Sequence, residues 1–112
     1  MYNYVMFKQE KHMITGKQRA YLRKISHDTE PIFQIGKDGI TDALIDGIDK
    51  ALIKREILKV HILETALLDT RETCDYVAKR LNAEPVQAIG NKFIIYRRSD
   101  EEKYRKIELP RK

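Results

Sequence analysis

Three segments of the chain repeat apolar residues at the spacing of an amphipathic helix. Thr15, Thr41 and Asp69 stand at their starts, where a short polar side chain can cap the first backbone amides. Gln18, three residues after Thr15, completes a capping box. The predicted buried stripes are Gln18, Tyr21, Leu22 and Ile25; then Leu44, Ile48, Ala51 and Leu52; then Cys74, Val77, Ala78 and Leu81. The pattern predicts three helices, each with one buried face.

Four shorter segments are rich in branched and aromatic residues, which is typical of strands: residues 32–35, 56–63, 85–89 and 92–98. The second is mostly apolar and is expected at the centre of a sheet. Gly90-Asn91 predicts a two-residue hairpin between the last two strands. The order is therefore α-β-α-β-α-β-β. Its two βαβ crossovers predict parallel neighbours, and the hairpin adds an antiparallel strand, giving an α/β fold with a mixed four-stranded sheet packed with helices.

The two ends of the chain lie outside this pattern. Residues 1–12 show no helix or strand period and are interpreted as an N-terminal extension, with an extra edge strand over residues 2–7 as the alternative. Residues 13–99 form the predicted domain. Residues 100–112 are a charged C-terminal tail, which we expect to be frayed rather than helical.

Charge and cysteine content narrow the classes of function. Lys and Arg number 22 against 17 Asp and Glu, a net charge of +5 that favours a polyanionic partner. No apolar run approaches the ~20 residues of a membrane span, and the first residues lack the apolar stretch of a signal peptide. Cys74 is the only cysteine, so no internal disulfide and no cysteine pair for zinc can form. We expect a cytoplasmic protein without a membrane partner.

Residues that could carry catalysis are sparse. Neither nucleotide-binding glycine fingerprint is present. Ser26, His27 and Asp28 are triad residue types, but they are consecutive and are interpreted as a solvated helix terminus. His61 and Glu64 would point to different faces of a strand. We expect no metal site, no cofactor, no small-molecule substrate and no enzymatic activity.

The first predicted helix is basic. It carries Lys17, Arg19, Arg23 and Lys24 and no acid between residues 15 and 27. Arg19 and Arg23 are like charges four residues apart, which disfavours a helix by about 0.2–0.5 kcal/mol. Phosphate oxygens would explain this arrangement, while ordinary solubilising charge is the alternative.

A glycine-rich loop, Gly36-Lys37-Asp38-Gly39, lies between a predicted strand and a helix start. Glycines let a backbone approach a ligand closely, and the amides of a helix N-terminus accept phosphate. Lys37 adds a donor, whereas Asp38 repels phosphate unless it points aside. We expect the loop and the basic helix to form one continuous cradle. Of the arginines at positions 97 and 98, which face opposite sides of a strand, at most one would extend it.

Four separated segments, residues 14–24, 31–41, 57–63 and 88–98, resemble the CRM domain (chloroplast RNA splicing and ribosome maturation) in order and spacing. The chain is similar to the single-domain, YhbY-like bacterial members. Residues 1–12 do not belong to the family pattern, so their role stays open. The resemblance implies a fold like the C-terminal domain of translation initiation factor 3. It also implies RNA binding through a GxxG loop and a basic surface, and association with precursors of the large ribosomal subunit.

The resemblance assigns RNA binding to two groups of residues: Gly36, Lys37, Asp38 and Gly39 in the loop, and Lys17, Arg19, Arg23 and Lys24 in the helix. It implies ribosomal RNA as the partner. No aromatic platform for stacking bases is present in the sequence. Two other interpretations stay open. The protein could be an interaction module that docks an acidic partner through its basic helix, or an enzyme that binds a phosphorylated substrate at the loop with Asp38 or Asp42 as acid or base.

Overall fold

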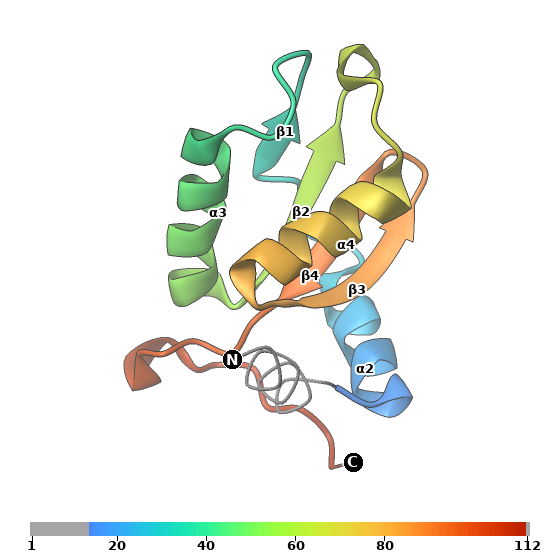
Figure 1. Ribbon diagram of the computed structural model, residues 1–112. Helices are drawn as coiled ribbons and strands as arrows, with labels where there is room; N and C mark the ends of the chain where they lie inside the picture. Colours follow the sequence, from blue (N-terminus) through green and yellow to red (C-terminus); the bar gives the residue numbers. More distant parts are fainter. Residues whose placement is uncertain (1–13, 112) are drawn as a thin grey trace, which may run out of the picture.

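The computed structural model describes residues 14–111, which form three layers, with helices on both faces of one sheet (Figure 1). Within this range the helices are α2 (Gly16–Ser26), α3 (Asp42–Arg55) and α4 (Thr70–Leu81). The strands are β1 (Phe33–Ile35), β2 (Ile57–Ile62), β3 (Glu84–Ile89) and β4 (Lys92–Tyr96), and the short 3₁₀ helices are η1 (Glu64–Ala66) and η2 (Glu102–Tyr104). The predicted element order and mixed four-stranded sheet are confirmed. No helix in residues 14–111 has the length and apolar content that crossing a bilayer requires.

The strand order in the sheet is β1-β2-β4-β3. β1 and β2 are parallel neighbours, as expected, and β4 is antiparallel to both β2 and β3. The expectation that β2 and β3 are also neighbours is wrong, because β4 lies between them. Residues 93–96 of β4 are all buried and need a strand on each side, whereas Pro85 of β3 lacks a backbone donor and suits an edge.

Each face of the sheet has its own core. α3 and α4 cover one face, and α2 covers part of the other (Figure 1). The larger core joins α3 and α4 to the inward side chains of β2 and β4, including Leu58, Val60, Phe93 and Ile95. The smaller core gathers Leu22, Val86, Ile94 and Tyr96, with Ile14, Ile57, Ile107 and Leu109 packed against it. Successive side chains of β2 point to opposite faces of the sheet, so its odd-numbered side chains lie on the α2 side.

The predicted helix starts are confirmed by their caps. The Thr15 hydroxyl accepts a hydrogen bond from the Gln18 amide at 3.1 Å, and the Gln18 side chain accepts one from the Thr15 amide at 3.0 Å. Thr41 caps α3 through the amide of Leu44, and Asp69 caps α4 in the same way. These local interactions depend on residues three positions apart, which is why the sequence predicts them.

The buried face of α2 differs from the predicted stripe. Leu22 is fully buried, but Ile25 is 41% exposed and its place is taken by Ser26. The Ser26 hydroxyl donates to the Leu22 carbonyl at 2.6 Å, so a polar side chain is satisfied inside the helix interface. Ser26 is therefore not part of a solvated terminus, although His27 and Asp28 are exposed as predicted.

The C-terminal tail is docked on the domain, so the expectation of a frayed tail is wrong. Buried Glu56 accepts hydrogen bonds from the backbone amides of Ser99, Lys106 and Ile107. Gln18 donates to the Pro110 carbonyl at 2.9 Å. These contacts connect residues up to 92 positions apart, which no local pattern reveals. The extension and alternative strand predicted for residues 1–12 lie outside the described residues.

Candidate functional site

The glycine loop forms a tight turn at the end of β1, at the top of Figure 1. The Gly39 amide donates to the Gly36 carbonyl at 2.9 Å. Gly39 has φ +69°, in the left-handed region that side chains disfavour. Lys37 and Asp38 are exposed at the tip, and neither makes an ion pair or side-chain hydrogen bond within residues 14–111. The Asp38 carboxylate therefore does not occupy the turn.

The turn leads directly into the N-terminus of α3. The Thr41 side chain uses the Leu44 amide, so the earlier amides of the first turn have no capping side chain. Gln34, Lys37 and Thr41 line a shallow hollow of about 370 Å³ beside the turn. Exposed Asp42 adds one negative charge to this region. The arrangement presents backbone donors and one lysine on the surface beside the start of α3.

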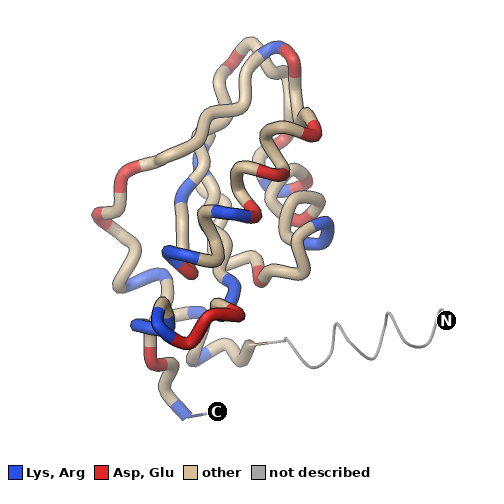
Figure 2. Tube along the Cα trace, turned by 90° about the vertical axis from the view of Figure 1, so that its left-hand side faces the viewer, with Lys and Arg blue, Asp and Glu red and all other residues tan. Residues whose placement is uncertain are grey.

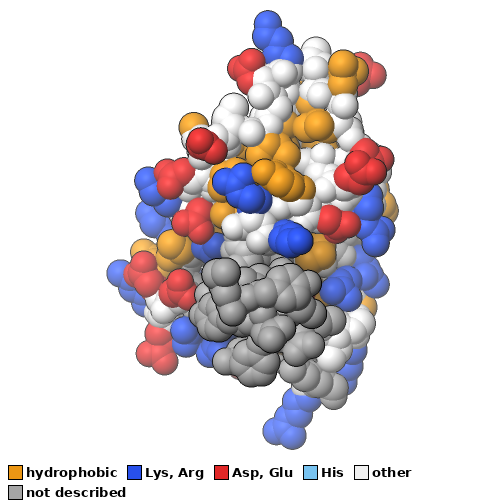
Figure 3. Space-filling model, viewed as in Figure 1, with side chains coloured by type: hydrophobic (Ala, Val, Ile, Leu, Met, Phe, Trp, Pro, Cys, Tyr) orange, Lys and Arg blue, Asp and Glu red, His pale blue; other side chains and the backbone are white. Residues whose placement is uncertain are grey.

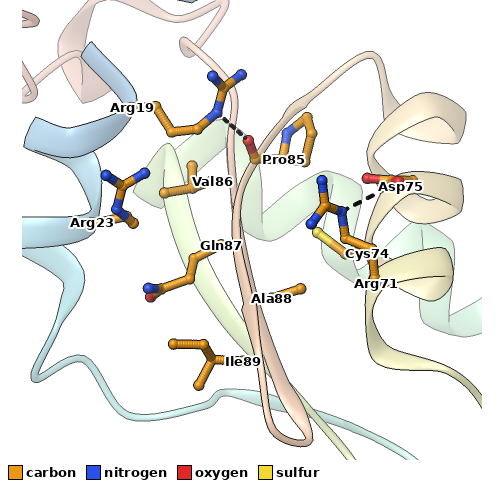
Figure 4. A pocket seen from close by; sticks show the side chains of 10 residues that line it. All are labelled: Arg19, Arg23, Arg71, Cys74, Asp75, Pro85, Val86, Gln87, Ala88 and Ile89. Carbon is orange, nitrogen blue, oxygen red and sulfur yellow. Dashed lines mark hydrogen bonds and ion pairs between the residues drawn. The ribbon is translucent and has the colours of Figure 1, made fainter. Parts of the chain in front are cut away.

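The basic side chains of α2 point in two directions. At about 100° per residue, Arg19 and Arg23 lie on the flank of the buried face, and Lys17 and Lys24 lie on the outer side. The latter two are exposed, while Arg19 and Arg23 are partly buried. The Arg19 Nε donates to the Pro85 carbonyl of β3 at 3.0 Å (Figure 4). This hydrogen bond gives Arg19 a structural role in the fold. The helix tolerates the like charge of Arg23 four residues away.

Arg19 and Arg23 line a hollow of about 600 Å³ along the exposed edge of β3. Figure 4 shows these arginines on one side of β3 and Arg71 of α4 on the other. Arg71 lies 3.8 Å from Asp75, an exposed pair that restrains it weakly. We name this feature the arginine hollow. Arg71 gives no signal in the sequence, because its helix carries both charge signs and only the fold brings it to β3.

Two titratable groups near the arginine hollow, Glu84 and Cys74, have pKa values that burial raises. Burial raises the pKa of the Glu84 carboxyl, and a hydrogen bond from the Ile14 backbone and the charge of Arg19 oppose that shift. Burial, reinforced by the Asp75 charge, raises the pKa of the Cys74 thiol from 9.0 to about 12. A thiol with this pKa is protonated near neutral pH and is a poor nucleophile.

The loop and the arginine hollow are on opposite edges of the sheet. The loop follows β1, the hollow borders β3, and β2 and β4 lie between them. Three strand spacings separate the two edges by about 14 Å. The expectation that loop and helix adjoin in one cradle is therefore wrong: any ligand that contacts both must cross the sheet.

The two arginines after β4 have different roles. Arg97 donates to the Asp49 carboxylate at 2.8 Å and to the backbone carbonyls of Asp49 and Leu81. It joins α3 to α4 and is unavailable to a ligand, whereas Arg98 is exposed. This contact also gives Asp49 of α3 a structural role. Within residues 14–111, no group of three metal-ligating side chains is present.

The chain is similar in sequence to known proteins. Residues 14–97 match the CRS1 / YhbY (CRM) domain. A Bacillus subtilis (strain 168) relative named "Probable RNA-binding protein YqeI" is 41% identical over 98 residues, covering 88% of this chain and 100% of the relative. "Probable RNA-binding protein MJ0652" of Methanocaldococcus jannaschii is 33% identical over 94 residues, covering 82% of this chain and 69% of the relative.

A solved structure has the same architecture. The solution structure of SAV1595 from Staphylococcus aureus, described as an RNA-binding candidate, superposes with a TM-score of 0.70 at 41% identity. It covers 88% of this chain and 100% of that chain. The family match over residues 14–97 spans all four strands and the helices α2, α3 and α4. The chain belongs to the CRS1/YhbY (CRM) domain family.

Proposed function

We propose that this protein is a non-catalytic RNA-binding protein. The loop residues Gly36, Lys37, Asp38 and Gly39 and the helix residues Lys17, Arg19, Arg23 and Lys24 form its binding surface. The observation that carries the proposal is the exposed turn at the N-terminus of α3, with left-handed Gly39 and an unengaged Lys37. Its backbone amides and the helix dipole suit a phosphate of the RNA chain. The relatives named as RNA-binding proteins support the same partner.

The cations of α2 would neutralise phosphates beyond the turn. Arg23 has a fork of donors that matches phosphate oxygens, and Lys17 and Lys24 act as mobile point charges. Binding of this kind weakens steeply with salt, with a log–log slope of about −0.7 per phosphate contacted on a single strand. Because Arg19 already bonds Pro85, its remaining donors rather than its Nε would face the RNA.

We further propose ribosomal RNA as the partner, with a role in assembly of the large ribosomal subunit in the cytoplasm. The support is the family membership and the resemblance to YhbY-like members. The excess of basic residues agrees with a large polyanion.

The test combines Arg23→Glu with Lys37→Glu and measures the shift of a ribosomal RNA fragment in native gels. We expect binding to be abolished at concentrations at which the parent protein is saturated. Arg19 is left unchanged because its bond to Pro85 supports the fold. Near-ultraviolet circular dichroism checks that the variant is folded.

The matched control reverses Lys54 and Lys79, two exposed lysines on α3 and α4. It makes the same change in net charge on the other face of the sheet, and we expect RNA binding to stay close to that of the parent. Equal loss in both variants would show a non-specific charge effect and contradict the site.

Docking of an acidic protein partner is the second candidate function. The edge of β3 favours it, because arginines flank the exposed backbone of this strand. The two functions differ in a simple observation. An RNA-binding protein purified without nuclease retains nucleic acid and shows a raised ratio of absorbance at 260 nm to that at 280 nm. A ratio typical of protein alone, with a salt-sensitive protein complex instead, would favour the second function.

A further inference from the structure

Helix α2 covers only one end of its face of the sheet. At one end, Val86, Ile94 and Tyr96 are buried beneath α2 and the C-terminal tail. At the other end, toward the β3–β4 hairpin, Ile89 is 64% exposed. Lys92 and Gln34 are exposed there as well. An open sheet face therefore lies between the end of α2 and the hairpin.

The strand register brings polar and basic residues into rows on this face. One row runs through all four strands, because Gln34 pairs with His61, His61 with Lys92, and Lys92 with Ile89. In the next row Lys59 pairs with Ile94, which pairs with Gln87. Neither row contains an acid. The acids that follow α2 in the chain, Asp28 and Glu30, lie outside both rows.

Lys59 is held in position on this face. Its Nζ donates to the His27 carbonyl at the end of α2 at 3.2 Å. One of its three donors is used, so two are left for a ligand. Lys59, Lys92 and His27 surround a hollow of about 340 Å³, to which Gln87 and Ile89 also contribute. We name this feature the sheet hollow.

The sheet hollow connects the two parts of the proposed binding surface. Gln87 and Ile89 line both the sheet hollow and the arginine hollow. At the opposite edge, Gln34 lines the hollow beside the glycine loop and begins the row that contains His61 and Lys92. Basic or polar side chains thus extend from Arg23, over the open sheet, to the turn at Gly36–Gly39.

The other face of the molecule has a different charge pattern. On the α3 and α4 side, acidic and basic side chains are interspersed (Figure 3). Along α3, the long helix in the middle of Figure 2, acidic positions alternate with other residues and basic ones gather at its lower end. A polyanion meets charges of both signs on that face, and only cations and neutral groups in the two rows of the open sheet.

We propose that the open half of the sheet, with Lys59, His61 and Lys92, binds the middle of a single-stranded RNA segment whose ends lie at the arginine hollow and the glycine loop. This inference rests on the proposed function. The size of the sheet hollow, about 340 Å³, suits one nucleotide rather than a duplex. No aromatic side chain is exposed in the two rows, so the lysines hold phosphates and Ile89 offers an apolar surface to a sugar or base.

The test replaces Lys59 and Lys92 together by Gln, which removes two charges and keeps a donor for the His27 carbonyl. Its control replaces Lys54 and Lys79 by Gln on the α3 and α4 side. Affinity is measured by fluorescence anisotropy with single-stranded RNA of about 4 to about 16 nucleotides, the range of site sizes for single-strand binding folds. The parent is expected to gain affinity with length until the strand spans the sheet.

For the sheet variant we expect about tenfold weaker binding at about 0.15 M salt, and a log–log salt slope smaller by about 1.4, as two lost phosphate contacts require. The control is expected to keep the affinity and slope of the parent. Unchanged binding by the sheet variant, with loss in Arg23→Glu/Lys37→Glu, would overturn the inference and leave the proposed function standing. A parent that binds no RNA would remove the proposed function itself.

A second copy of this chain is the competing occupant of the open sheet. In that case the Lys59→Gln/Lys92→Gln variant would change the sedimentation coefficient of the protein without changing its RNA affinity, and the inference would be overturned. A monomeric parent and variant that differ only in RNA affinity would support it.

Discussion

At the scale of single residues, the two glycines of the loop have different physical reasons to be glycine. Gly39 has a left-handed backbone with nothing within 4 Å of an added Cβ, so conformation rather than space restricts it. Gly36 has no such backbone, and an added Cβ would be in ordinary contact with Leu63 at 3.7 Å. The fold therefore requires glycine at position 39 and tolerates a small side chain at position 36.

We predict that Gly39→Ala lowers the free energy of unfolding by about 1–2 kcal/mol, the cost of a left-handed conformation for a residue with a Cβ. Gly36→Ala is the matched control and should change it by less than about 0.5 kcal/mol. Urea denaturation measures both. A loss in Gly36→Ala as large as in Gly39→Ala would contradict the assigned backbone roles.

Cys74 is a second residue whose environment decides its behaviour. It is 1% exposed, and its thiol has a pKa raised to about 12 by burial. Because the folded state holds the proton more tightly than the unfolded chain, this contribution to stability is present below pH 9.0 and is lost as pH rises toward about 12. We predict that the parent loses unfolding free energy more steeply than Cys74→Ala over this range.

Chemical denaturation at several pH values gives the two profiles, and parallel profiles would show that the thiol is not shifted. A disulfide reagent at pH 8 provides an independent check. It should label Cys74 rapidly only in denaturant, since the native thiol is both buried and protonated.

At the scale of elements, Glu56 connects the α3–β2 junction to the tail. Its carboxylate accepts from the amides of Ser99, Lys106 and Ile107 at 2.9, 3.0 and 3.3 Å. The tail then places Ile107 and Leu109 against the α2 core. The second core is thus completed by a segment that has little regular structure of its own, and a buried acid orders it.

We predict that Glu56→Gln lowers the free energy of unfolding by about 1–3 kcal/mol, because the side-chain amide turns an NH₂ group toward a backbone donor and leaves both unsatisfied. Glu102→Gln, an exposed carboxyl in η2, is the control and should be close to neutral. Thermal and urea unfolding compare the pair. A neutral Glu56→Gln would mean that the tail is not held by this carboxylate.

At the scale of the whole molecule, the sheet separates two surfaces of different composition. α3 and α4 present both charge signs, and the α2 side presents the basic helix, the sheet hollow and access to the arginine hollow. The glycine loop stands at the edge where β1 ends. A ligand that contacts the basic helix, both hollows and the glycine loop covers the α2 side and two edges of the sheet. It leaves the outer surfaces of α3 and α4 free.

We predict that single-stranded RNA shifts the backbone amide resonances of Lys92, Gln87 and Gly39 in a heteronuclear NMR titration. Amides in the middle of α3, such as that of Lys50, should move little, since the outer surface of this helix carries acids. Larger shifts in the middle of α3 than on the open sheet would contradict the proposed orientation of the RNA.

The sequence alone determined the elements whose signals are local. The capping residues Thr15, Thr41 and Asp69, the apolar stripe of α4 and the Gly90-Asn91 turn act over a few positions, and the structure confirms them. The family was recognisable for a related reason: four short runs keep their order and spacing along the chain. The glycine loop is visible as a tetrapeptide, and its predicted position between a strand and a helix start is confirmed.

Only the tertiary structure decided what depends on contacts between distant segments. The position of β4 between β2 and β3 depends on which strand can fill the centre of the sheet. The docking of the tail on Glu56 and the bond between Arg97 and Asp49 join residues more than 40 positions apart. The row of Gln34, His61 and Lys92 exists only through strand register. Such contacts form because a buried polar group needs a partner and an apolar strand needs cover on both sides, and these demands are met in space rather than along the chain.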